Sequence, residues 1–137
     1  MITVIIHGIL SALIATSIQK TIQGARQKKI KINLIAIKTA QLVYRQKHGA
    51  FAGEGVGFTN VSQINAALGL DIIDNSGSPT HQYVAYSCNT TGGYRCIAEY
   101  KNNNVTQFTY TWVFTGVSPP GGSDVPVCTH GAMSCLP

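Results

Sequence analysis

The chain lacks acidic residues, proline and cysteine over long stretches of its N-terminal part. The first carboxylate is Glu54, the first proline is Pro79 and the first cysteine is Cys88. The absence of proline removes the residue that most strongly interrupts a helix, and the absence of cysteine excludes disulfides from this part of the chain. The residues up to His48-Gly49 can therefore form one continuous helix, and its charged side chains have one sign.

Motifs of the common enzyme classes are also missing. The sequence contains no phosphate-binding glycine loop, no H-E-x-x-H zinc motif, no G-x-S-x-G nucleophile motif and no C-x-x-C-H haem motif. The five acidic residues are dispersed, and His48, His81 and His130 have no evident partners. The stretch Cys128-Thr129-His130 has a poor spacing for metal ligands. We therefore expect no catalytic activity, no cofactor and no metal site.

The first nineteen residues, MITVIIHGILSALIATSIQ, contain no Lys, Arg, Asp or Glu. A helix from Met1 to Ile18 rises about 1.5 Å per residue and covers about 27 Å, close to the ~30 Å hydrocarbon core of a bilayer. A cleaved secretory signal begins with basic residues and has a shorter apolar stretch, whereas here no basic residue precedes the run and the helical pattern continues beyond it. We therefore expect a retained segment that lipid or other protein surfaces must cover.

Charge is distributed unevenly along the chain. Residues 1–53 carry a formal charge of +8, and residues 54–137 a formal charge of −3. The basic side chains of the first part are Lys20, Arg26, Lys28, Lys29, Lys31, Lys38, Arg45 and Lys47. Such a basic helix can attract the weakly acidic head of another copy, or anionic lipid headgroups. No aromatic residue interleaves with the basic residues at 26–31, so we do not expect nucleic acid to be a partner.

The helical pattern from Lys20 to Lys47 places apolar residues on two sides. Lys31, Lys38 and Arg45 recur every seven residues and define a basic stripe. The opposite arc, which we expect to contact the rest of the domain, holds Ile32, Ala36, Ile37, Ala40, Val43 and Tyr44. The apolar residues that flank the basic stripe are Leu34, Ile35 and Leu42. One small domain needs only one apolar side of a helix, so the second side favours contact with partner helices; ordinary partial exposure is the alternative.

A second, shorter helix is expected after the long one. Gly49 is a plausible end for the long helix, and the glycine-rich connector AFAGEGVGFT follows it. Asn60 to Leu68 is typical of a short helix, with Thr59 or Asn60 as the N-cap and Gly69 as the terminator. Residues 74–80, DNSGSPT, have the composition of a loop.

Strand patterns dominate the remainder of the chain. Residues 82–88 and 94–101 flank an Asn-Thr-Thr-Gly-Gly hairpin turn, and residues 106–114 alternate strictly. One face of the third strand holds Phe108, Tyr110, Trp112 and Phe114, and we expect it to lie on the Ile32–Tyr44 side of the helix. The sequence therefore predicts an α+β fold. A long, protruding N-terminal helix (1–48) packs on a three- to four-stranded antiparallel meander in a globular head (49–137).

All four cysteines lie in the head, at positions 88, 96, 128 and 135. An even number in a turn-rich head behind an apolar segment favours two disulfides in an oxidising compartment, and free or metal-bound thiols are the alternative. Four cysteines allow three connectivities. Because a three-residue loop, Thr91-Gly92-Gly93, places Cys88 directly opposite Cys96 across the hairpin, we expect these two to pair.

Two blocks of sequence resemble the type IV pilins and the related type II secretion pseudopilins. The first is Ile5-Ile6-His7-Gly8-Ile9-Leu10-Ser11-Ala12-Leu13-Ile14-Ala15, which is similar to the apolar helix start of that family. The second is Thr39–Phe51, TAQLVYRQKHGAF, which is similar to its Tyr-containing helix end and the following Gly-aromatic turn. Cys128 and Cys135 resemble the pair that closes a loop near the C-terminus of such pilins. The resemblance therefore implies a Cys128–Cys135 disulfide.

The resemblance further implies a structural role. Residues 1–19 are expected to anchor the chain in the cytoplasmic membrane before assembly, with the head outside the cytoplasm, and to form the core of an extracellular helical filament afterwards. The expected membrane and filament-core residues are Ile5, Ile6, Gly8, Ile9, Leu10, Ala12, Leu13, Ile14 and Ile18. The expected partners are other copies of the chain, the pilus assembly machinery and the membrane. The alternatives are a secretion-system pseudopilin and a membrane-tethered, adhesin-like binding module. Asn60, Asn89 and Asn104 match the glycosylation sequon, which matters only in a host with that machinery.

Overall fold

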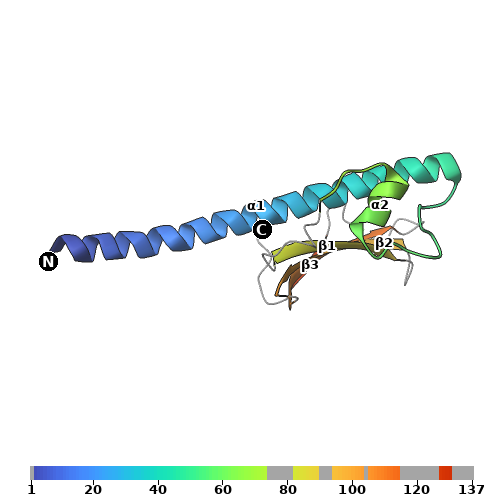
Figure 1. Ribbon diagram of the computed structural model, residues 1–137. Coiled ribbons are helices and arrows are strands. Elements are labelled where there is room, and N and C mark those ends of the chain that lie inside the picture. The colour runs from blue at the N-terminus through green and yellow to red at the C-terminus, as the bar shows by residue number, and fades with distance from the viewer. Residues whose placement is uncertain (1, 74–81, 90–93, 104, 115–126, 131–137) are drawn as a thin grey trace.

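A long helix lies across one face of a small antiparallel sheet in the computed structural model, and its N-terminal part extends beyond the sheet (Figure 1). The structure describes residues 2–73, 82–89, 94–103, 105–114 and 127–130. The elements are α1 (Ile2–His48), α2 (Val61–Leu68), β1 (Gln82–Asn89), β2 (Tyr94–Asn102), β3 (Val105–Phe114) and β4 (Val127–His130). The expected α+β fold with a long N-terminal helix on an antiparallel meander is confirmed.

Both helices end where the sequence predicts. α1 stops at Gly49, whose φ is +79° and whose N–H donates a hydrogen bond to the carbonyl of Arg45 at 2.7 Å. Asn60 is the N-cap of α2, because its side chain accepts a hydrogen bond from the N–H of Gln63. Gly69 closes α2 in the left-handed conformation.

The four strands form a meander in the order β1-β2-β3-β4, with every neighbouring pair antiparallel. The β1–β2 register places Cys88 opposite Cys96, as the hairpin spacing predicts. The register shifts between Tyr100 and Lys101, where β2 meets β3. The expectation of three to four strands is met by four. The fourth is β4, in the segment around Cys128 for which the sequence pattern predicted only a disulfide-closed tail.

The core lies between α1 and the inner face of the sheet. Phe108 and Tyr110 are fully buried there, as the alternation of β3 predicts; the side chains of Trp112 and Phe114 lie outside the described residues. The neighbouring strands and α2 contribute Tyr86, Cys88, Cys96, Ala98, Tyr100, Val61 and Ile64 to the same cluster. α1 contributes one buried row with alternating spacings of three and four: Gln27, Ile30, Leu34, Ile37 and Gln41.

The predicted helix face is therefore wrong in part. Ile37 is in the core, but Ile32 is 64% exposed and Val43 is 45% exposed. The other expected contact residues, Ala36, Ala40 and Tyr44, are only partly buried. Leu34, which was expected beside the basic stripe, is buried in their place. Positions two apart on a helix differ by about 200°, so Ile32 points away from the side on which Ile30 meets the sheet.

The N-terminal segment has a helical backbone. The expected core residues from Ile5 to Ile14 lie within α1, but their side chains lie outside the described set. Ile18, the last of them, is 51% exposed. No helix among the described residues is long and apolar enough to cross a membrane.

Candidate assembly surface

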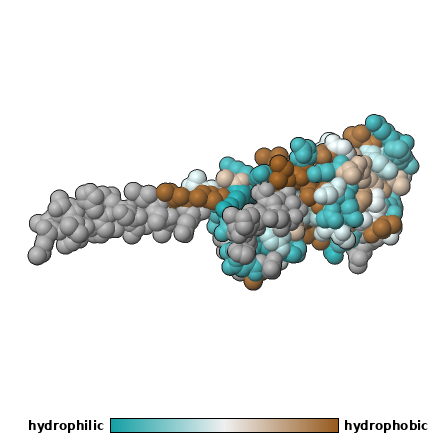
Figure 2. Space-filling view, viewed as in Figure 1, coloured by the Kyte–Doolittle hydropathy of each residue, from teal (hydrophilic) through white to brown (hydrophobic). Residues whose placement is uncertain are grey.

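The side of α1 that faces away from the sheet carries a line of apolar residues, here called the outer stripe. Positions 18, 22, 25, 29, 32, 36, 39 and 43 follow the alternating spacing of four and three that two helices share in a coiled coil. Lys29 and Thr39 are the polar residues at these positions, and the apolar members of the stripe are Ile18, Ile22, Ala25, Ile32, Ala36 and Val43. Ile32 and Val43 are exposed, as are Ile18 and Ile22, and Ile35 and Leu42 extend the apolar area to one side. Figure 2 shows apolar side chains on the upper side of α1, above the sheet. The sequence correctly indicated two apolar sides but assigned Ile32 and Val43 to the wrong one.

Basic residues interrupt and end the outer stripe. Lys29 occupies the stripe position between Ala25 and Ile32, and Lys47 follows Val43 by one turn; both lysines are exposed. The first 53 residues contain no carboxylate. The outer stripe is thus an apolar surface with a positive border.

Other polar residues of α1 bind tyrosines of the sheet. Arg26 Nη1 donates a hydrogen bond to the Tyr100 hydroxyl at 2.7 Å, and its guanidinium lies 5.6 Å from the centre of that ring. Asn33 Nδ2 donates to the Tyr86 hydroxyl at 2.8 Å. The Lys31 ammonium lies 5.6 Å from the centre of the Tyr110 ring. Part of the basic run therefore fixes the helix on the sheet, a role that charge counting alone does not reveal.

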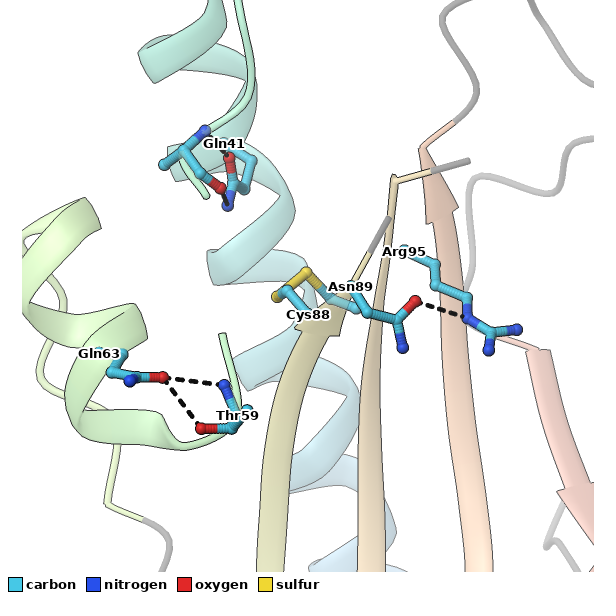
Figure 3. Close-up of a disulfide and its surroundings, with 8 residues drawn as sticks. Gln41, Thr59, Gln63, Cys88, Asn89 and Arg95 are labelled. Carbon is cyan, nitrogen blue, oxygen red and sulfur yellow. Dashed lines mark hydrogen bonds between the residues drawn. A yellow bond between two sulfur atoms is a disulfide. The ribbon is translucent and has the colours of Figure 1, made fainter. Parts of the chain in front are cut away.

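Two buried glutamines mark the ends of the core row on α1. Gln27 Oε1 accepts a hydrogen bond from the Tyr110 hydroxyl at 3.0 Å. Burial raises the pKa of that hydroxyl above its usual value. Gln41 Oε1 accepts from the N–H of Ala52 at 2.9 Å, and Gln41 Nε2 donates to the Ala52 carbonyl at 3.2 Å (Figure 3). Hydrophobic periodicity does not predict the burial of either glutamine, because it ignores polar residues whose hydrogen bonds are satisfied in the core.

The glycine-rich connector forms a tight turn that presents Val56 to solvent. The N–H groups of Val56 and Gly57 both donate to the carbonyl of Gly53, at 3.2 and 2.7 Å. Glu54 Oε2 accepts a hydrogen bond from the N–H of Phe51 at 3.0 Å. Val56 is 91% exposed at the tip of this turn.

The connector is held against the hairpin of the sheet at Gly57 and Phe58. The Phe58 backbone pairs with Cys88 through two hydrogen bonds, at 2.6 and 2.8 Å. Gly57 has a φ of +77°, and a Cβ at this position would lie 2.8 Å from the Cys88 carbonyl oxygen. Glycine is therefore required by conformation and by space.

Cys88 and Cys96 form a disulfide, as predicted. Both residues are buried, and the bond lies between β1 and β2 beside the point where the connector joins the sheet (Figure 3). One residue further on, Arg95 Nε donates to Asn89 Oδ1 at 3.0 Å. Cys128 lies on β4, but Cys135 lies outside the described residues, so the Cys128–Cys135 pair stays a prediction.

Across residues 2–73 and the described strands, no group of three His, Cys, Asp or Glu side chains is placed to hold a metal ion. The candidate functional surface is the exposed apolar and charged surface of α1 and the connector, where Ile32 is 64% exposed and Val56 is 91% exposed.

No protein-family model matches the chain, and searches of curated proteins and of solved structures find no match. The fold is pilin-like in its long N-terminal helix, its antiparallel sheet and its disulfide.

Proposed function

We propose that the protein is a structural subunit of a type IV pilus-like filament, assembled through the N-terminal part of α1. The observation that carries the proposal is the form of α1 itself. It is a single 47-residue helix whose charge-free start extends beyond the head, while its second part lies on the sheet. The backbone of this part extends beyond the sheet (Figure 1), and bundling with the same segment of other copies would remove its apolar side chains from water.

The composition of this segment suits close packing of helices. Gly8, Ser11, Ala12 and Ala15 are small, and small residues allow helix backbones to approach closely in apolar surroundings. The isoleucine and leucine side chains between them fill the remaining space. The same composition suits a membrane-anchored stage before assembly, in which lipid covers the helix.

The disulfide favours a head that matures outside the cytoplasm. Cys88 and Cys96 are both buried and paired across the hairpin, and such bonds form and persist in oxidising compartments. An anchored subunit with its head outside the cytoplasm, later moved into a surface filament, fits this requirement.

Two alternatives share parts of this evidence. A secretion-system pseudopilin would use the same helix for a short assembly, and electron microscopy of sheared surface material separates it from a pilus by the absence of long filaments. A membrane-tethered, adhesin-like module would use the apolar segment only as an anchor. Truncation distinguishes that module, because its head would keep its binding partner without residues 1–19.

Substitution of Leu10 by Asp tests the proposal. A charge near the middle of an apolar helix costs on the order of 3 kcal/mol in membrane-insertion scales, so Leu10→Asp should abolish filaments while the head keeps its fold. Leu10→Met, which conserves volume and polarity, is the matched control and should assemble normally. The measurement is filament yield in sheared surface fractions. Normal filaments from the Leu10→Asp chain would contradict the proposed role of this segment.

A further inference from the structure

Two exposed apolar features lie in parts of the chain with opposite formal charge, one within the basic residues 1–53 and one within the acidic residues 54–137. Ile32 on the outer stripe lies one turn from Lys29, in a part of the chain without carboxylates. Val56, at the tip of the connector turn, lies two residues from Glu54 in the head. Each feature thus combines an exposed apolar side chain with an exposed charge, and the two charges are opposite.

The connector turn is held in a fixed conformation that exposes Val56 for contact with a partner. Its backbone closes on the Gly53 carbonyl, its Glu54 carboxylate is held by the Phe51 N–H, and Gly57 fits against the Cys88 carbonyl. Val56 is therefore presented at 91% exposure by a turn that is fixed on both sides. A fixed turn loses little conformational freedom when it binds.

Charge argues against pairing the outer stripe with the same stretch of a second copy. A parallel pair in register would place Lys29 against Lys29, and no carboxylate before Glu54 could offset the repulsion. The head, in contrast, has a formal charge of −3 over residues 54–137. The stripe therefore suits an acidic, apolar surface of another head better than it suits itself.

We propose that the connector turn of one copy packs on the outer stripe of the next, with Val56 against Ile32 and Glu54 beside Lys29. This contact joins two different surfaces, so each copy offers one surface to each neighbour. A contact of this kind that does not close into a ring generates an open helical polymer. The inference rests on the proposed function, because the occupant is a second copy within the filament.

Serine substitutions test the apolar half of the contact in the full chain. Val56→Ser and Ile32→Ser should each lower filament yield by about tenfold or more, because each removes most of a buried aliphatic side chain from the interface. Ile73→Ser is the matched control, since Ile73 is 62% exposed and also lies two residues from an exposed acid, Asp71. It should leave the yield unchanged. All three positions are exposed in the monomer, so the fold should persist, as checked by circular dichroism.

Charge reversal and crosslinking test the pairing itself. Glu54→Lys and Lys29→Glu should each reduce the yield. The double variant should recover part of it, because the charges pair again although the hydrogen bond from the Phe51 N–H to Glu54 is lost. Glu54→Lys combined with Lys47→Glu is the control and should recover none. Val56→Cys with Ile32→Cys in one chain should give a ladder of disulfide-linked multimers from filaments on non-reducing gels. Ile73→Cys with Ile32→Cys should give none.

The outcomes separate this contact from the proposed function. Wild-type filaments together with normal yields from Val56→Ser and Ile32→Ser overturn the contact alone. Loss of filaments in Ile73→Ser with normal yield in Val56→Ser also overturns the contact. The part of the head that binds the neighbouring copy would then lie near Ile73 and not at the connector turn. If the wild-type chain forms no filaments, the proposed function fails and the contact fails with it.

Discussion

The hydroxyl of Tyr110 donates a hydrogen bond to Oε1 of Gln27 at 3.0 Å, although 83 residues separate the two in sequence. Both side chains are buried, Tyr110 on β3 and Gln27 at the N-terminal end of the core row on α1. The bond joins the first residue of the buried row on α1 to the sheet, next to the hydrogen bond from Arg26 to Tyr100. N-terminal to this point the helix extends beyond the sheet (Figure 1).

Replacement of Tyr110 by Phe should lower the free energy of unfolding by about 1–2 kcal/mol, because the ring stays in the core but the donor to Gln27 is lost. Urea denaturation in detergent, followed by the fluorescence of Trp112, measures the change. Tyr83→Phe is the control, because Tyr83 is only partly buried and lies outside the core cluster. Its effect should be smaller. Equal effects at the two positions would contradict a special role for the buried bond.

The same hydroxyl should make stability fall at alkaline pH. Burial raises the folded-state pKa of Tyr110, so the folded protein holds this proton more tightly than the unfolded chain. The contribution is complete below the unfolded-state pKa near 10 and is lost as the pH rises through the folded-state pKa. Urea denaturation from pH 8 to 11 should therefore show a steeper loss for the wild-type chain than for Tyr110→Phe. If the stability of the two chains falls equally between pH 8 and 11, the ionisation of Tyr110 is not linked to unfolding.

Gln41→Leu should destabilise the start of the connector. The substitution removes two hydrogen bonds to the Ala52 backbone in a buried place, at a cost of about 1–3 kcal/mol. Hydrogen exchange of the Ala52 amide should become faster, and the urea midpoint should fall. Gln46→Leu, at an exposed position on the same helix, should leave both unchanged. An unaltered Ala52 exchange rate would show that other contacts hold this turn.

Much of the fold follows from local patterns. The absence of proline predicts the length of α1, Asn60 and Gly69 predict the ends of α2, and the short hairpin predicts the Cys88–Cys96 pair. Each depends on residues close in sequence, where the rules of capping and turn geometry are strong.

The choice of helix face depends on distant residues and could not be predicted in the same way. Gln27 and Gln41 are polar, so a hydrophobic pattern leaves them out, yet Tyr110 and the Ala52 backbone satisfy them in the core. When Gln27 and Gln41 are left out, hydrophobic periodicity cannot distinguish the buried row that includes Leu34 from the apolar arc around Ile32. The sequence allowed a fourth strand but did not place it, since the four residues of β4 become a strand only through pairing with β3.

Two alanine substitutions in the connector should lower the free energy of unfolding by different amounts, and the difference reports the contact between Gly57 and the Cys88 carbonyl. Gly55 and Gly57 both have positive φ, but a Cβ at Gly55 meets nothing within 4 Å, whereas one at Gly57 lies 2.8 Å from the Cys88 carbonyl oxygen. Gly55→Ala should cost about 1–2 kcal/mol from backbone conformation alone. Gly57→Ala should cost more, because it also displaces the connector from β1. Urea denaturation compares the two, and equal losses would contradict the steric requirement at Gly57.

A chain that begins at Lys20 should fold and remain monomeric. Its core is intact, because the row from Gln27 to Gln41 and the inner face of the sheet are all retained. The connector contact proposed above involves a single turn on one helix, and surfaces of that size seldom hold two proteins together without further contacts. Sedimentation velocity should therefore show one monomeric species, with a urea midpoint close to that of the full chain in detergent. Filaments formed by the shortened chain would show that assembly does not depend on residues 1–19, and unfolding would show that the head needs that segment.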